Sequence, residues 1–121
     1  MKLARTSLIV RCSQDDADRI RNQASSEHRS LSGYLLYVLE RSMWIEDRLT
    51  HGLTKSILSA QADSIKSERH KQIRTAVHLR CTVEQAEKIC AYAARRHLSI
   101  SDFVVFSLQR TWDASERLHR S

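Results

Sequence analysis

Two short matching stretches constrain the fold of this chain more than any other feature of its sequence. Residues 5–12 read RTSLIVRC and residues 74–81 read RTAVHLRC. Apolar and polar residues alternate in both, and this period of two places successive side chains of a strand on opposite faces. Because a lone strand leaves its backbone groups unpaired, we expect the two stretches to pair as one antiparallel β-ribbon.

The expected ribbon has one apolar face and one basic face. The apolar face takes three residues from each strand: Leu8, Val10, Cys12, Val77, Leu79 and Cys81. The other face takes Arg5, Ser7, Ile9, Arg11, Arg74, Ala76, His78 and Arg80. Four arginines thus lie on the face of the ribbon that is expected to point away from the hydrophobic core. Such a face indicates a partner-binding surface.

The match continues far beyond the two strands. Residues 5–49 align with residues 74–118 without a gap, at an offset of 69, and 14 of the 45 aligned positions are identical. A repeat of this length indicates two copies of one strand–helix–helix unit. The identical positions are Arg5, Thr6, Arg11, Cys12, Ala17, Ile20, Ala24, His28, Ser30, Ser32, Leu39, Arg41, Arg48 and Leu49, with their counterparts.

Each unit carries start signals for two helices. Ser13 and Thr82 are N-cap residues followed three positions later by Asp16 and Gln85, a capping-box pattern that is clearest in the second unit. Small and branched residues then recur at helical spacing (Ala17, Ile20 and Ala24; Ala86, Ile89 and Ala93), up to about His28-Arg29 and His97-Leu98.

The second helix of each unit is expected to start after Ser30 and Ser99. Its apolar stripe comprises Leu31, Leu35, Val38, Leu39 and Met43 in the first unit, and Ile100, Val104, Leu108 and Trp112 in the second. Tyr34, Tyr37, Phe103 and Phe106 share this helical spacing, which favours core and rim positions over a base-stacking platform.

We expect residues 1–121 to form a single, mainly α-helical domain that contains the ribbon. The connecting segment 50–73 has a partial helical pattern, so an extra helix is expected there, and a flexible polar tether is the alternative. The net charge of +6 and pI of about 9.7 favour nucleic acid or another anionic partner. With no apolar run of membrane-spanning length, we expect a cytoplasmic protein.

The residues give no sign of catalysis, and we expect no enzyme, catalytic residue, metal or cofactor. Cys12, Cys81 and Cys90 lack metal-ligand or disulfide-framework spacing and are expected to be small core residues in a reducing compartment. The six histidines show no ligand spacing, and His28 and His97 fit helix ends. Asp15-Asp16 is interpreted as a helix start and Glu46-Asp47 as a solvated face.

This arrangement resembles the ribbon-helix-helix family of DNA-binding proteins, to which Arc and the methionine repressor belong. In that family two chains pair their strands and the ribbon enters the major groove. With both copies in one chain, the resemblance implies an intramolecular pseudo-dimer. The tandem layout is similar to the TraY proteins of conjugation and, more closely, to the VirC-type virulence proteins of Agrobacterium plasmids.

The resemblance assigns a role to each outward residue. Strand residues that would contact bases are Ser7, Ile9, Arg11, Ala76, His78 and Arg80. Residues that would contact phosphates are Arg5, Leu31, Ser32, Arg74, Ile100 and Ser101. Arg11 and Arg80 are the strongest base-reading candidates, because arginine can bond guanine O6 and N7 together. Exposed N–H groups at a helix start suit a phosphate.

Departures from a symmetric pattern affect the expected DNA site. Ile9 and Ala76 cannot hydrogen-bond a base, and the two strands differ at matched positions, so an imperfect or non-palindromic site is expected. Pseudo-symmetry predicts that Ile9 lies opposite His78, so paired residue numbers sum to 87. Cys12 and Cys81 would then lie roughly 20 Å apart, too far for a disulfide.

The leading interpretation is a non-enzymatic protein that binds double-stranded DNA. We expect an accessory factor for plasmid or T-DNA processing and conjugative-type transfer, with a relaxase or another transfer protein as partner. It would be monomeric in solution, with several copies able to bind one DNA. A transcriptional repressor of the same fold is one alternative, and a protein-interaction module that has lost DNA binding is another.

Overall fold

The computed structural model describes residues 4–49 and 73–120. These residues form four helices and one two-stranded antiparallel sheet, which confirms the expected mainly helical class. In chain order the elements are β1 (Arg5–Cys12), α1 (Gln14–Ser26), α2 (Leu31–Leu49), β2 (Thr75–Thr82), α4 (Val83–Arg95) and α5 (Ile100–Arg120). The extra helix expected in segment 50–73 lies outside the described residues, apart from Ile73.

The register of the ribbon is the one that the sequence predicts. β1 and β2 are antiparallel and Ile9 lies opposite His78, with every other pair also summing to 87. Cys12 faces Thr75 at one end and Cys81 faces Thr6 at the other. All three cysteines are free thiols, and Cys12 and Cys81 are buried as expected of core residues. The expectation is wrong for Cys90, which is exposed on the outer surface of its helix.

Burial alternates along both strands as the pattern requires. Val10, Cys12 and Leu79 have no exposed surface, and Val77 and Cys81 are also buried. The intervening residues of β1 are exposed, Ile9 at 51%. The ribbon therefore contributes one face to the core and leaves the other open.

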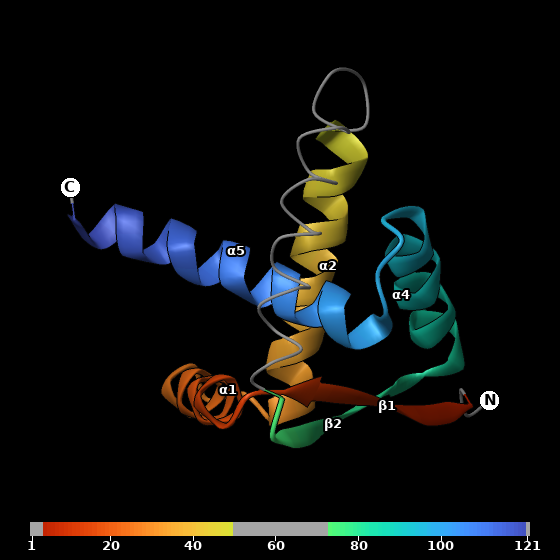
Figure 1. The fold of residues 1–121 in the computed structure, drawn as a ribbon, viewed down its shortest axis with the longest axis horizontal. Coiled ribbons are helices and arrows are strands. Elements are labelled where there is room, and N and C mark those ends of the chain that lie inside the picture. The colour runs from red at the N-terminus through yellow and green to blue at the C-terminus, as the bar shows by residue number, and fades with distance from the viewer. Residues whose placement is uncertain (1–3, 50–72, 121) are drawn as a thin grey trace.

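In Figure 1, α2, α4 and α5 lie above the ribbon, and α1 lies beside one of its ends. The long helices α2 and α5 cross above it, while α1 and α4 lie toward its opposite ends. The core forms where α2 and α5 meet, around buried Tyr34, Leu35, Phe103 and Leu108. Trp112 Nε1 donates a hydrogen bond to Tyr34 Oη at 2.9 Å, which joins the two long helices inside the core.

Side-chain caps start the helices where the sequence predicts. Ser13 Oγ accepts from the Asp16 N–H, and Thr82 and Gln85 form a complete capping box. Ser30 Oγ accepts from the Gly33 N–H at 3.0 Å, and Ser99 Oγ accepts from the Asp102 N–H at 3.1 Å. These bonds satisfy N–H groups that have no partner within their own helix.

The two shorter helices end in the same unusual way. His28 and His97 have φ of 55° and 56°, in the left-handed region that glycine normally occupies. The His97 N–H donates to the Ala94 carbonyl and the Leu98 N–H donates to the Ala93 carbonyl, the two bonds of a Schellman motif. The matched histidines therefore mark a strained helix end in each half of the chain.

Replacing His97 by glycine should stabilise the protein. Glycine adopts this backbone conformation without the steric penalty of a Cβ, so we expect the free energy of unfolding to rise by about 1 kcal/mol. Thermal denaturation followed by circular dichroism measures the change. His97→Ala is the matched control, because it removes the imidazole but keeps the Cβ. An equal gain in both variants would contradict the backbone explanation.

One expectation about charge is wrong. Glu46 does not lie on a solvated face, because only 2% of its surface is exposed. Its Oε1 atom lies 2.8 Å from Arg96 Nε in an ion pair that is buried on both sides. Asp47, the neighbouring residue, is exposed and accepts a hydrogen bond from the Tyr92 hydroxyl. The helical pattern could not predict this burial, because it depends on side chains from the end of α4 and its cap, Tyr92, Arg95 and Arg96, which reach these two carboxylates.

Burial perturbs the groups around Glu46. It raises the pKa of the Glu46 carboxyl, and the nearby Arg96 and Arg110 guanidinium groups oppose the rise without cancelling it. Burial also lowers the pKa of Arg110. Because the folded-state pKa of Glu46 lies above its unfolded value, its contribution to stability is greatest below the unfolded pKa. The contribution is lost as pH rises through the folded pKa.

Removing the partner of Glu46 should therefore destabilise the fold in a pH-dependent way. We expect Arg96→Met to lower the free energy of unfolding by about 3 kcal/mol at pH 8, because a buried carboxylate then loses its ion pair. The loss should be smaller at pH 4, where the carboxyl is protonated. Urea denaturation at both pH values measures the difference.

The double variant Arg96→Met/Glu46→Leu serves as the control for this prediction. It replaces the pair by apolar side chains and should recover most of the lost stability. An equal loss for the single variant at pH 4 and pH 8 would show that the ion pair is not the cause.

Candidate nucleic-acid interface

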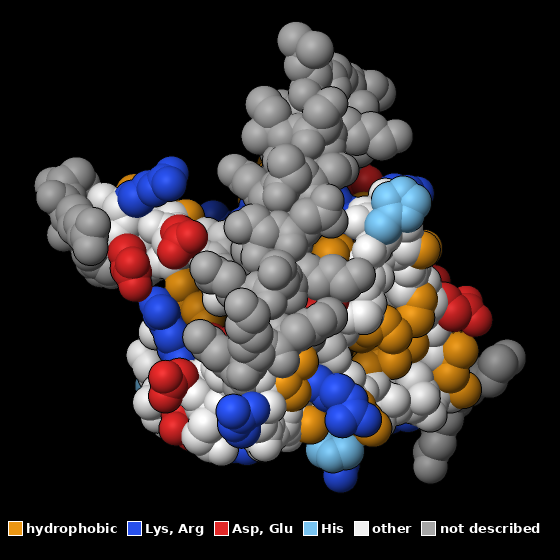
Figure 2. Space-filling view, viewed as in Figure 1, with side chains coloured by type: hydrophobic (Ala, Val, Ile, Leu, Met, Phe, Trp, Pro, Cys, Tyr) orange, Lys and Arg blue, Asp and Glu red, His pale blue; other side chains and the backbone are white. Residues whose placement is uncertain are grey.

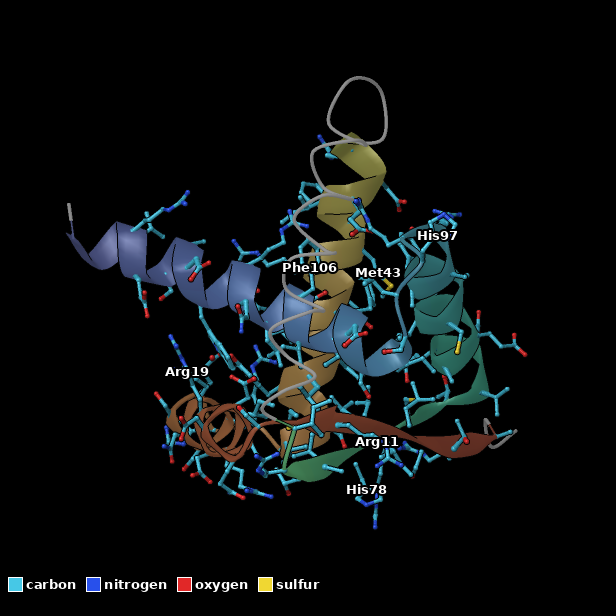
Figure 3. All side chains as sticks on the ribbon, in the orientation of Figure 1. Arg11, Arg19, Met43, His78, His97 and Phe106 are labelled. Atoms are coloured by element: carbon cyan, nitrogen blue, oxygen red, sulfur yellow. The ribbon has the colours of Figure 1, made fainter. Side chains whose placement is uncertain are left out.

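The open face of the ribbon carries the residues that the sequence places outward. Arg5, Ser7, Ile9 and Arg11 of β1 are exposed, as are Arg74, His78 and Arg80 of the second half, while Ala76 is half-buried. His78 points away from the helices (Figure 3). Blue and pale blue side chains mark this lower edge of the molecule in Figure 2.

The register arranges these residues in rows across the ribbon. Ser7 lies opposite Arg80, Ile9 opposite His78, and Arg11 opposite Ala76. Each inner row that holds an arginine therefore pairs it with a small side chain. Arg5 and Arg74 extend the face beyond these rows at its two ends.

The charged side chains that the two strands contribute are all of one sign. Neither strand contains an aspartate or glutamate, so four arginines stand on the face without an acidic residue of the same strand. Within the described residues, neither Arg5 nor Arg80 forms an ion pair, and Arg74 Nη1 donates to the neighbouring Ile73 carbonyl at 3.0 Å. The rows are thus suited to an anionic partner.

The long helices hold the ribbon through two matched serines. Ser32 Oγ, in the first turn of α2, accepts from the Arg80 N–H of β2 at 2.9 Å. Ser101 Oγ, in the first turn of α5, accepts from the Arg11 N–H of β1 at 2.8 Å and donates to the Ile9 carbonyl at 3.2 Å. Ser32 of the first half thus fixes β2 at Arg80, and Ser101 of the second half fixes β1 at Arg11.

These bonds bear on the expectation that the starts of the two long helices contact DNA phosphates. The hydroxyls of Ser32 and Ser101 already bond to the strands, and Ser101 is buried, so a phosphate would meet backbone N–H groups instead. The N–H groups of Leu31, Ser32, Ile100 and Ser101 have no hydrogen-bond partner among the described residues. Both helix starts lie beside the ribbon, close to Arg80 and Arg11.

Sequence analysis did not predict that Ser32 and Ser101 would form hydrogen bonds with the strands. A serine two residues after a cap serine recurs in both units, Ser30-x-Ser32 and Ser99-x-Ser101. A two-stranded ribbon has two free edges whose N–H groups need acceptors. That requirement, combined with the repeated serine, is the signal that could have predicted the contact.

Within residues 4–49 and 73–120, no group of three or more His, Cys, Asp or Glu side chains could hold a metal ion. The helices of this part of the chain include none that is long and apolar enough to cross a membrane. Comparison of the chain with family models, curated proteins and solved structures found no match.

The Ser101 bonds give a direct prediction for stability. Ser101→Ala would leave the Arg11 N–H and the Ile9 carbonyl without this partner, so we expect the free energy of unfolding to fall by about 1–3 kcal/mol. Ser115→Ala, on the exposed part of α5, is the matched control and should change it by less than about 0.5 kcal/mol. Chemical denaturation compares the two. A loss no larger at Ser101 than at Ser115 would exclude a structural role for this bond.

Proposed function

We propose that this protein binds double-stranded DNA by inserting the open face of its ribbon into the major groove. The observation that carries the proposal is the row arrangement of exposed Arg11 and Arg80, with Arg5 and Arg74 beyond them and no acid on either strand. A two-stranded ribbon fits the width of the major groove, and arginine can read guanine there.

The helix starts support the same proposal. Their unpaired N–H groups and the positive ends of the helix dipoles would each receive a backbone phosphate, and the serine bonds keep them at a fixed distance from the arginines. Phosphate contacts would then position the ribbon while the strand residues read bases. The mechanism is binding alone, without a catalytic step.

We further propose that the chain is a tandem ribbon-helix-helix protein whose two halves form an intramolecular pseudo-dimer. The repeat in the sequence, the antiparallel pairing of its two strands and the matched helix ends support this assignment. Joining the halves keeps each at an effective concentration of about millimolar or more for the other, so pairing does not depend on protein concentration.

The layout is similar to TraY and, more closely, to the C-terminal domain of the second VirC virulence protein of Agrobacterium tumour-inducing plasmids. On that resemblance we propose an accessory role in plasmid or T-DNA processing, with a relaxase as a protein partner. A transcriptional repressor would use the same ribbon. A protein-interaction module is the second class of function, and the exposure of Ile9 favours it, because an apolar side chain on the ribbon also suits a protein surface.

Fluorescence anisotropy with a labelled duplex of random sequence tests DNA binding. We expect the logarithm of the affinity to fall by about 0.9 per phosphate contact for each logarithmic unit of salt. On a duplex that the protein has selected from a random library, Arg11→Ala/Arg80→Ala should weaken binding at least about thirtyfold, since each arginine–guanine contact contributes about 1–3 kcal/mol.

The matched control is Arg48→Ala/Arg117→Ala. These arginines also occupy equivalent positions of the two halves, but they are exposed near the far ends of α2 and α5. The control removes the same charge and should retain most of the affinity. If both double variants bind alike, or if the wild type does not bind at low salt, the ribbon is not a DNA-binding surface. A protein-interaction role would then be the better explanation.

A further inference from the structure

We infer that the ribbon binds its DNA in one orientation, set by Ser7 and Ile9 on one strand and by Ala76 and His78 on the other. This inference rests on the proposed DNA binding and extends it to the form of the target. The recognised site would be directional, and the protein would place its two halves on defined sides of it.

The outer framework of the face is symmetric. Arg11 and Arg80 occupy equivalent positions, each two residues from the central row of Ile9 and His78. At a rise of about 3.4 Å per residue their backbone positions are roughly 14 Å apart along the ribbon, close to four base pairs of about 3.4 Å each. Each arginine would therefore contact a guanine, and the two guanines would be about four base pairs apart on opposite strands.

The chemistry between the arginines is not symmetric. Ser7 lies beside Arg80 and can add a hydroxyl donor or acceptor to that row, whereas Ala76 lies beside Arg11 and offers a methyl group. In the central row, exposed Ile9 can contact a thymine methyl and His78 can hydrogen-bond a base edge. A palindrome would present the same base to Ile9 as to His78, so one of the two would be mismatched.

The starts of α2 and α5 also differ from each other, which adds to the asymmetry of the face. α5, whose first turn bonds to Arg11, carries the buried acid Asp102 in that turn, and the equivalent residue of α2 is Gly33. A Cβ at Gly33 would lie 2.9 Å from Ser30 Oγ, so the cap of α2 favours glycine there. A carboxylate near the α5 start opposes a phosphate, and the end of the ribbon near Arg80 is thus the stronger anchor.

Selection of bound duplexes from a random library, followed by sequencing, tests the inference with the intact chain. For the wild type we expect an enriched motif that is not its own reverse complement, with guanines on opposite strands about four base pairs apart. A palindromic motif, or salt-dependent binding without any motif, would overturn the inference and leave DNA binding intact. No binding at low salt would overturn the proposed function itself.

Two variants make the face symmetric and extend the test. Ser7→Ala/Ile9→His gives both strands the outward residues of β2, and Ala76→Ser/His78→Ile gives both those of β1. All four positions lie on the open face outside the core, so we expect both variants to keep the thermal stability of the wild type. Each should select a palindrome, and the two palindromes should differ. Retention of the wild-type motif by both variants would contradict the assignment of these four residues.

A direct measurement of orientation uses Cys90. This thiol is exposed on α4, toward one end of the ribbon, whereas Cys12 and Cys81 are buried, so a donor dye can be attached there selectively. Energy transfer is then measured to an acceptor placed at one end or the other of a duplex of about 20 base pairs that carries the selected motif. Oriented binding predicts unequal transfer from the two ends. Equal transfer with the wild type would overturn the inference, and equal transfer with the symmetric variants would support it.

Discussion

The pairing of the two strands in a single register is the constraint on which the rest of the structure depends. Side chains alternate with a period of two, so a shift of one residue would turn the arginines into the core and Val10 and Leu79 toward solvent. The observed register avoids this cost. It also decides which side chains share a row, and therefore what the open face can bind.

Two layers keep the ribbon in place once it has paired. The apolar face of the ribbon packs on the long helices, and Ser32 and Ser101 accept from strand N–H groups at its free edges. The same helix starts therefore serve structure and the proposed function. Their hydroxyls hold the strands, and the first N–H groups of each helix keep no hydrogen-bond partner among the described residues.

Two asymmetric features of the molecule, the open face and a buried ion pair, have different physical consequences. On the open face it changes the chemistry presented to a partner. Inside the fold it takes the form of the buried Glu46–Arg96 pair, whose equivalents in the repeat are Ser115 and Glu27. That pair joins α2 of one half to the end of α4 of the other, and its equivalent cannot form an ion pair on the opposite side.

Sequence alone predicted the strands, their register, the caps and the core stripes, because each is encoded by local periodicity or by the repeat. Leu35, Leu39 and Leu108, for example, are buried as their spacing requires. The burial of Glu46 and the acceptor role of Ser101 could not be predicted in this way. Both depend on which other element packs against that position. A helical pattern predicts which face of a helix is apolar, but it does not predict which element packs on the rest of the helix. The assignment of the open face to DNA stays a proposal.

The most direct test of that assignment is a titration of the ¹⁵N-labelled protein with duplex DNA, followed by amide chemical shifts. DNA in contact with the ribbon predicts the largest shifts in residues 5–11 and 74–80 and at the starts of α2 and α5. The far ends of the long helices should be little changed. Large shifts confined to the outer surfaces of the helices, with the strand amides unchanged, would contradict the account.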